Sequence, residues 1–155
     1  MRPLQLKLTG INSYREEQII DFETLTSQGL FGIFGPTGSG KSSILDAMTL
    51  ALYAKLPRDT KNFINTNEKK ANVSFLFSIT TDKTRKYLAE RSFRYHTGTS
   101  ASTVRNTTGR LILYEGDTET VLADKPTEVT NECIRLLGLT SEDFMRTVVL
   151  PQGQF

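Results

Sequence analysis

The N-terminal residues alternate apolar and polar positions with the period of a β-strand. Leu4, Leu6 and Leu8 are separated by single polar residues, which predicts a strand with one buried face. Residues 18–22, Gln-Ile-Ile-Asp-Phe, follow a polar turn at 12–17. The two runs are close enough along the chain to pair, so we predict an N-terminal hairpin.

Residues 30–34 change the pattern to a short, nearly continuous apolar run, Leu-Phe-Gly-Ile-Phe. Such a run is expected of a strand that is covered on both faces within a parallel sheet. Between Lys41 and Pro57 the apolar residues recur with helical spacing. They cover enough of the helix to predict burial on several sides: Ile44, Leu45, Ala47, Met48, Leu50, Ala51 and Leu52.

Beyond Pro57 the period returns to two. It predicts antiparallel strands at 73–79 and 87–93. A further strand is predicted at 111–114, followed by a short apolar segment at 121–122. Small polar residues at 96–103 predict an exposed, mobile loop, with His96 at the surface.

Two helices are predicted after these strands. Pro126 opens the first, which runs to Leu137 and stops at Gly138, because proline favours the start of a helix and glycine its end. Cys133 falls on its apolar side, which predicts a buried, unreactive thiol. A last helix begins near Ser141.

The composition is that of one soluble domain. The chain has 155 residues, of which 37% are apolar and 23% charged. The alternating N-terminus contains no signal-peptide core, and no apolar run approaches the roughly 18 residues of a membrane-spanning helix. A single cysteine cannot form an internal disulfide. We therefore expect an intracellular, cytoplasmic protein with no membrane partner.

Charge is distributed unevenly along the chain. Residues 55–110 contain twelve Lys or Arg against four Asp or Glu, whereas residues 111–144 contain eight acids against two bases. A basic segment suits a phosphate backbone. A solvated sheet face that serves solubility has the same composition, and the sequence leaves both interpretations open.

Residues 35–42, Gly-Pro-Thr-Gly-Ser-Gly-Lys-Ser, match the P-loop pattern G-x-x-x-x-G-K-[ST] between a predicted strand and a predicted helix. Glycines at 35, 38 and 40 let the backbone curl so that its N–H groups face phosphate oxygens at a helix N-terminus. Lys41 would reach the β- and γ-phosphates, and the Ser42 hydroxyl would bind Mg²⁺. The motif predicts a site for ATP with Mg²⁺.

The residues around this motif indicate a more specific class of P-loop protein. Residues 35–53, GPTGSGKSSILDAMTLALY, resemble the Walker A segment and following helix of the SbcC family, bacterial SMC-like ATPases of double-strand-break processing. Residues 144–155, FMRTVVLPQGQF, resemble that family's Q-loop, and LTGINSY at 8–14 with IIDF at 19–22 is similar to its opening hairpin. Ala54 departs from the family, which usually has glycine after the Leu-Tyr pair.

The resemblance implies the functional residues. Lys41 and Gln152 would be catalytic, and Ser42 and Gln152 would flank Mg²⁺. Tyr14 and Arg15 are further candidates for contact with the base or a phosphate, although an exposed turn ordinarily contains such residues. The expected nucleotide-binding residues are Asn12, Ser13, Gly35, Pro36, Thr37, Gly38, Ser39, Gly40, Lys41, Ser42 and Ser43.

The resemblance also implies the fold. It is an α/β P-loop NTPase, with residues 1–155 forming the N-terminal lobe of an ABC/SMC-like ATPase head. The lobe would have an antiparallel β subdomain, an incomplete parallel sheet, a P-loop at 35–42 and a Q-loop at 150–155. No run of four apolar residues precedes Asp-Glu, so a Walker B strand cannot be placed. We expect the chain alone to bind ATP without turnover, and the full-length protein to hydrolyse it.

The implied partners are the C-terminal lobe of the same protein, a second head that closes on ATP binding, an SbcD-type nuclease and double-stranded DNA. From the density of positive charge we predict DNA contacts within the basic segment, at Lys61, Lys69, Lys70, Arg91 and Arg94.

Three alternatives remain open. An ABC transporter ATPase also combines a P-loop with a Q-loop, but it would serve a membrane partner. A small-molecule P-loop kinase would need a helical lid, whereas this chain continues into predicted strands. A vestigial P-loop predicts that ATP with Mg²⁺ leaves the melting temperature unchanged and that Lys41→Ala is silent.

Overall fold

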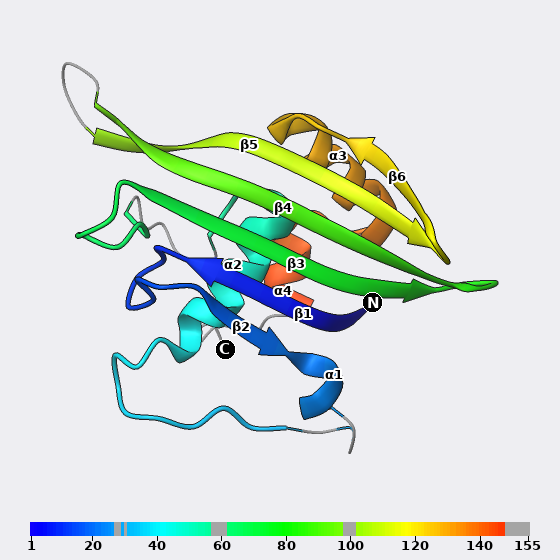
Figure 1. The fold of residues 1–155 in the computed structure, drawn as a ribbon, viewed down its shortest axis with the longest axis horizontal. Coiled ribbons are helices and arrows are strands. Elements are labelled where there is room, and N and C mark those ends of the chain that lie inside the picture. Colours follow the sequence, from blue (N-terminus) through cyan, green and yellow to red (C-terminus); the bar gives the residue numbers. More distant parts are fainter. Residues whose placement is uncertain (27–28, 30, 57–61, 98–101, 148–155) are drawn as a thin grey trace.

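A computed structural model describes residues 1–26, 29, 31–56, 62–97 and 102–147. Its centre is a six-stranded sheet in the order β2-β1-β3-β4-β5-β6 (Figure 1). All five strand pairs are antiparallel. The strands are β1 (Arg2–Thr9), β2 (Gln18–Asp21), β3 (Lys70–Thr80), β4 (Thr84–Thr97), β5 (Ser102–Glu115) and β6 (Thr118–Ala123).

Helices cover one face of this sheet, which we call the inner face (Figure 1). They are α2 (Lys41–Tyr53), α3 (Pro126–Leu137) and α4 (Ser141–Thr147), while the single-turn α1 (Phe22–Leu25) follows β2. Alternate residues of the strands point to the helices and are buried, as in Leu6, Phe75 and Ala89. The core therefore lies between α2, α3 and the sheet. The opposite, outer face carries polar residues together with Leu76, Leu88 and Tyr114.

The N-terminal hairpin, the helix that begins at Lys41 and the two C-terminal helices are confirmed. Helix α3 begins at Pro126 and ends at Leu137, where Gly138 adopts a left-handed φ of 68°. Cys133 is buried as predicted, and burial raises the pKa of its thiol to about 12. The thiol is therefore protonated at neutral pH and has little nucleophilic character.

The predicted strand at 30–34 is wrong for the residues that the structure describes. Residues 31–34 have no regular secondary structure, and Phe34 is 93% exposed. A buried parallel strand requires a neighbouring strand on each side. The described residues form only the antiparallel sheet, so they supply no partner for an apolar segment at this position.

The predicted loop at 96–103 is also wrong at both ends. Strand β4 continues through Thr97, β5 begins at Ser102, and His96 pairs with Thr103. Threonine is a good strand former, so a small-polar composition does not by itself end a strand. His96 is exposed, as predicted.

Ala54 adopts a left-handed conformation with a φ of 55° just after α2. Its N–H donates to the carbonyl oxygen of Leu50 at 2.9 Å, so the helix ends in the usual way. Glycine is preferred at this position because an L side chain is strained there by about 1 kcal/mol. Ala54 therefore takes the conformation that glycine favours at the end of a helix, and this adds strain.

Within the described ranges, no helix combines the length and apolar character needed to span a bilayer.

Candidate nucleotide-binding site

The P-loop residues lead into α2 through left-handed glycines. Gly38 has a φ of 86° and Gly40, the N-cap of α2, has a φ of 91°. No side chain caps the first turn of this 13-residue helix. Ser43 N–H donates to the carbonyl oxygen of Gly40 at 2.9 Å, so the N–H groups of Lys41 and Ser42 are the ones that can donate to an anion. The helix dipole favours negative charge at the same end.

A cavity of about 560 Å³ opens in front of these donors. The exposed Ser42 lies in its lining, where its hydroxyl is a suitable oxygen ligand for Mg²⁺. The donor set thus fits a phosphate chain with its metal. The lining residues are Asn12, Ser13, Thr37, Gly38, Gly40, Lys41, Ser42, Ser43, Asp46, Leu56 and Phe63.

Three of these lining residues were not predicted from the sequence. Asp46 lies four residues after Ser42 on α2, and this spacing could have identified it because such residues share a helix face. Leu56 and Phe63 come from the chain after α2, and no local pattern connects them to the P-loop.

Lys41 is held by its own loop. Its ammonium donates to the carbonyl oxygens of Gly35 at 2.6 Å and Pro36 at 2.7 Å. Both acceptors are neutral. Charged phosphate oxygens accept stronger hydrogen bonds, so ATP offers this lysine better partners than the loop does.

The turn after β1 contacts the P-loop directly. Asn12 Nδ2 donates to Ser43 Oγ at 2.9 Å, and Ser13 Oγ donates to the carbonyl oxygen of Gly38 at 3.0 Å. The ring of Tyr14 packs on Gly40 so closely that a Cβ there would lie 2.7 Å from it. Asn12 and Ser13 therefore lie at the predicted site, where Ser13 bonds to Gly38 of the loop and Asn12 to Ser43 of α2.

Arg15, the other candidate from this turn, forms an ion pair with Glu68 at 2.8 Å. Gln152 and Lys61 lie outside the described residues.

The nominated basic residues divide into two groups. Lys69, Lys70 and Arg94 are exposed. Arg91 is only 2% exposed, so it must be removed from the set of DNA contacts. Charge density was misleading here. The period-two pattern places Arg91 with Ala89 and Phe93 on the inner face, and this signal could have identified its burial.

The guanidinium of Arg91 joins the ends of two helices. Nε and Nη2 donate to the carbonyl oxygens of Ala51 and Leu52 at the end of α2, at 2.8 and 2.9 Å. Nη1 and Nη2 donate to Pro126 O and Thr130 Oγ1 of α3, both at 2.9 Å. Burial lowers the pKa of Arg91 to about 10, so it stays charged at neutral pH and faces the negative end of the α2 dipole.

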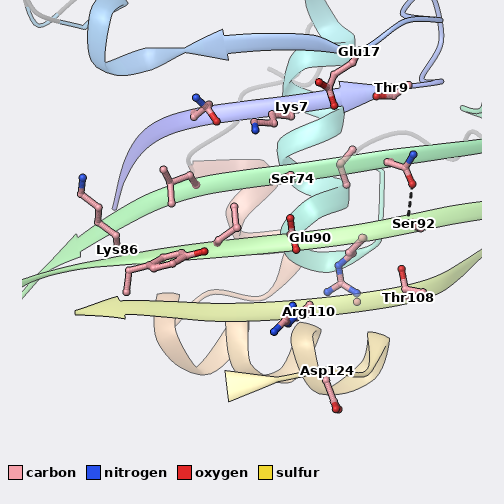
Figure 2. A pocket seen from close by; sticks show the side chains of 18 of the residues that line it. Lys7, Thr9, Glu17, Ser74, Lys86, Glu90, Ser92, Thr108, Arg110 and Asp124 are labelled. Carbon is pink, nitrogen blue, oxygen red and sulfur yellow. Dashed lines mark hydrogen bonds between the residues drawn. The ribbon is translucent and has the colours of Figure 1, made fainter. Parts of the chain in front are cut away.

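The outer face of the sheet contains an open groove of about 1000 Å³ (Figure 2). Arg91 also lines it, but its guanidinium is bonded to α2 and α3. The other charged side chains of the lining are three bases and three acids, so they give the groove no net preference for an anion. The bases are Lys7, Lys86 and Arg110, and the acids are Glu17, Glu90 and Asp124.

Positive charge concentrates instead where β3 begins. Lys70 pairs with Arg94, and Arg94 pairs with Arg105, so three exposed bases form one cross-strand row. In the described part of the chain none of the three has an ion-pair partner. Like charges opposite each other destabilise a sheet. We call Lys70, Arg94 and Arg105 the basic row; Arg105 was not among the contacts nominated from the sequence.

Gly10 sets the start of the turn that supports the site. Its φ is 69°, and a Cβ there would lie 2.3 Å from the carbonyl oxygen of Lys70. Gly116 is a matched control because its φ is 60° and its Cβ position is open. Urea unfolding of the 155-residue chain should show that Gly10→Ala lowers the free energy of unfolding by about 2.5 kcal/mol, against about 1 kcal/mol for Gly116→Ala. Equal losses of free energy of unfolding in the two variants would contradict the close approach of Gly10 to the carbonyl oxygen of Lys70.

Comparison with known proteins gives a family and a set of relatives. The AAA domain family matches residues 5–155. The chain is 46% identical over 155 residues to the SbcC component of the nuclease SbcCD from Clostridium acetobutylicum, and 51% identical over 158 residues to that of Bacillus subtilis. It is 36% identical over 160 residues to the probable DNA double-strand break repair Rad50 ATPase of Aquifex aeolicus. These alignments cover 100% of this chain but only 13%, 14% and 15% of the relatives.

Proposed function

The chain belongs to the AAA domain family, and from this premise we propose that it is the ATP-binding lobe of an SMC-like ATPase that acts in DNA double-strand-break processing. The observation that carries the proposal is the cavity in front of the P-loop, where uncapped N–H donors, Lys41 and Ser42 meet. The names of the relatives support the biological process. They do not favour a transporter or a small-molecule kinase.

Within this proposal the P-loop binds the phosphates of ATP. The backbone of residues 35–43 surrounds them, and Lys41 exchanges its bonds to neutral carbonyls for bonds to the β- and γ-phosphates. Ser42 would hold Mg²⁺, which neutralises charge that develops on the γ-phosphate. Gln152 would orient water or metal beside it, as the resemblance implies.

Residues 1–155 would then be the N-terminal lobe of a longer protein with the Q-loop at 150–155. The irregular apolar segment at 31–34, with Phe34 exposed, supports this because it would be covered by strands from a C-terminal lobe. The other proposed partners are a second head, an SbcD-type nuclease and double-stranded DNA, with the protein acting in the cytoplasm.

Turnover separates this proposal from a vestigial P-loop. The full-length protein should hydrolyse ATP in the presence of Mg²⁺. The 155-residue chain should bind ATP with Mg²⁺ and release no phosphate, because no Walker B carboxylate can be placed in it. Phosphate release and calorimetric titration measure the two properties. Absence of both binding by the chain and turnover by the full-length protein would refute the proposal.

We place the DNA contacts at the basic row and at Lys69. The row joins exposed bases of three strands, and a phosphate backbone would relieve their mutual repulsion. Lys61 belongs to the same proposal on charge density alone. The outer groove, which mixes acidic and basic side chains, is a less favourable site (Figure 2).

Replacing the basic row by alanines in the full-length protein should weaken DNA binding about 100-fold at low salt, because each phosphate contact releases counterions. The slope of log K against log salt should fall by about 3. A matched triple replacement of Lys7, Lys86 and Arg110 in the groove should change either quantity much less. Equal effects of the two triple variants would contradict the placement.

A further inference from the structure

Asp46 brings a buried carboxylate to the cavity in front of the P-loop. It lies on α2, is 5% exposed and belongs to the cavity lining. Among the described residues of that lining it is the only acidic one. In the described part of the chain it is also the only buried carboxylate. Because a carboxylate loses its hydration when it is buried, such a group is kept where it interacts with a cation or with hydrogen-bond donors.

The position of Asp46 on the helix directs its side chain toward Ser42. The two residues are four positions apart on α2, so their Cβ atoms lie about 5–6 Å apart on one helix face. Each Cα–Cβ bond of a helix tilts toward the N-terminus, so Asp46 leans toward the turn that contains Ser42. Both residues line the same cavity. The carboxylate is therefore next to the hydroxyl that suits Mg²⁺.

A carboxylate at this place disfavours a phosphate chain that arrives without a metal. Like charges repel each other more strongly in a buried site of low dielectric constant than in water. Lys41 and the start of α2 attract phosphates, whereas Asp46 opposes them. A divalent cation that accompanies the phosphates reverses the effect of Asp46, because the cation attracts both the phosphates and the carboxylate.

Mg²⁺ is suited to an indirect contact with such a group. It loses bound water reluctantly and usually keeps several water molecules, so few protein side chains bind it directly. A carboxylate beyond the direct ligands accepts hydrogen bonds from groups on the metal and fixes their orientation. Indirect partners of this kind typically change metal affinity about 10–100-fold.

We propose that Asp46 is a positioning residue for the Mg²⁺ that accompanies ATP, and that it acts through a water molecule bound to the metal. The inference rests on the proposed function, because that function supplies ATP and Mg²⁺ as the ligands of the cavity. Asp46 thereby makes the site favour ATP with Mg²⁺ over ATP alone.

The test compares nucleotide affinity with and without Mg²⁺. Calorimetric titration of the full-length protein with β,γ-imido-ATP, which resists turnover, gives a dissociation constant in each condition. The ratio of the two constants measures the contribution of the metal. Asp46→Asn keeps the shape of the side chain and removes its charge. It should weaken binding with Mg²⁺ about tenfold and leave binding without Mg²⁺ unchanged or tighter, so the ratio should fall about tenfold or more.

Glu142→Gln is the matched control. Glu142 pairs with Lys55 just beyond the end of α2, its side chain is 53% exposed, and it is outside the described cavity lining. The variant removes one carboxylate near the same helix and should retain the wild-type ratio. Asp46→Ser removes the charge with a smaller side chain and gives the same measurement if Asp46→Asn does not fold. Thermal unfolding without nucleotide checks the fold of each variant.

The possible results have different meanings. If Asp46→Asn weakens binding equally with and without Mg²⁺, Asp46 has only a structural role and the inference is overturned. Wild-type affinities of Asp46→Asn in both conditions overturn it as well. A wild-type ratio of one overturns it while phosphate binding by the P-loop stands. A wild type that binds the analogue in neither condition refutes the proposed function itself.

Discussion

Replacement of Lys41 by alanine is expected to weaken the binding of ATP with Mg²⁺ about 100-fold or more. Hydrogen bonds from an ammonium to charged phosphate oxygens contribute about 1.5–3 kcal/mol each, and this lysine would make such bonds to two phosphates. The fold should survive, because Lys41 bonds only to its own loop. Calorimetric titration measures the affinity, and thermal unfolding without nucleotide checks the fold.

A matched lysine elsewhere controls for charge. Lys86 lies in the outer groove on β4, and Lys86→Ala removes the same charge without touching the P-loop cavity (Figure 2). Its nucleotide affinity should be that of wild type. If Lys41→Ala bound ATP as tightly as Lys86→Ala, the P-loop would be vestigial and the proposed function would lose its basis.

Replacement of Arg91 by methionine is expected to lower the free energy of unfolding by about 4 kcal/mol. Methionine has no donor, so the carbonyl oxygens of Ala51 and Leu52 would be left buried at the end of α2. Each unsatisfied buried acceptor costs about 1–3 kcal/mol, and the attraction of the guanidinium to the helix dipole is lost as well. Urea unfolding of the 155-residue chain measures the effect.

Arg94→Met, three residues further along the same strand, is the control because Arg94 is exposed on the outer face. It should change the free energy of unfolding by less than about 0.5 kcal/mol. Thr130→Val removes only one hydrogen-bond partner of Arg91 and should lower the free energy of unfolding by about 1 kcal/mol. This smaller loss can still be measured if Arg91→Met does not fold. Equal stabilities of Arg91→Met and Arg94→Met would show that the buried bonds contribute nothing.

Helix limits and the P-loop were predicted well because neighbouring residues determine them. Pro126 favours the first turn of α3, and Gly138 readily takes the left-handed φ that ends it. The P-loop likewise depends on a few consecutive residues, in which Gly38 and Gly40 allow the positive φ values of the loop. In both cases the deciding interactions span only a few positions of the chain.

Strand pairing was predicted less well, because apolar character indicates burial without indicating the partner. Residues 31–34 are apolar and yet have no regular structure, since no strand of the described chain lies beside them. Strand β4 extends to Thr97 because β5 pairs with it there, although the local composition favoured a loop. Such outcomes depend on residues far away along the chain.

The sequence by itself determined that this chain carries a P-loop at the start of a buried helix, because consecutive residues supply all the groups of the loop. Only the tertiary structure decided what surrounds it. Antiparallel register placed Lys70, Arg94 and Arg105 in one row and turned Arg91 inward to the end of α2. Folding also bonded the turn at Asn12 to both the P-loop and residue 65, because a hydrogen bond depends on distance in space and not on separation along the chain.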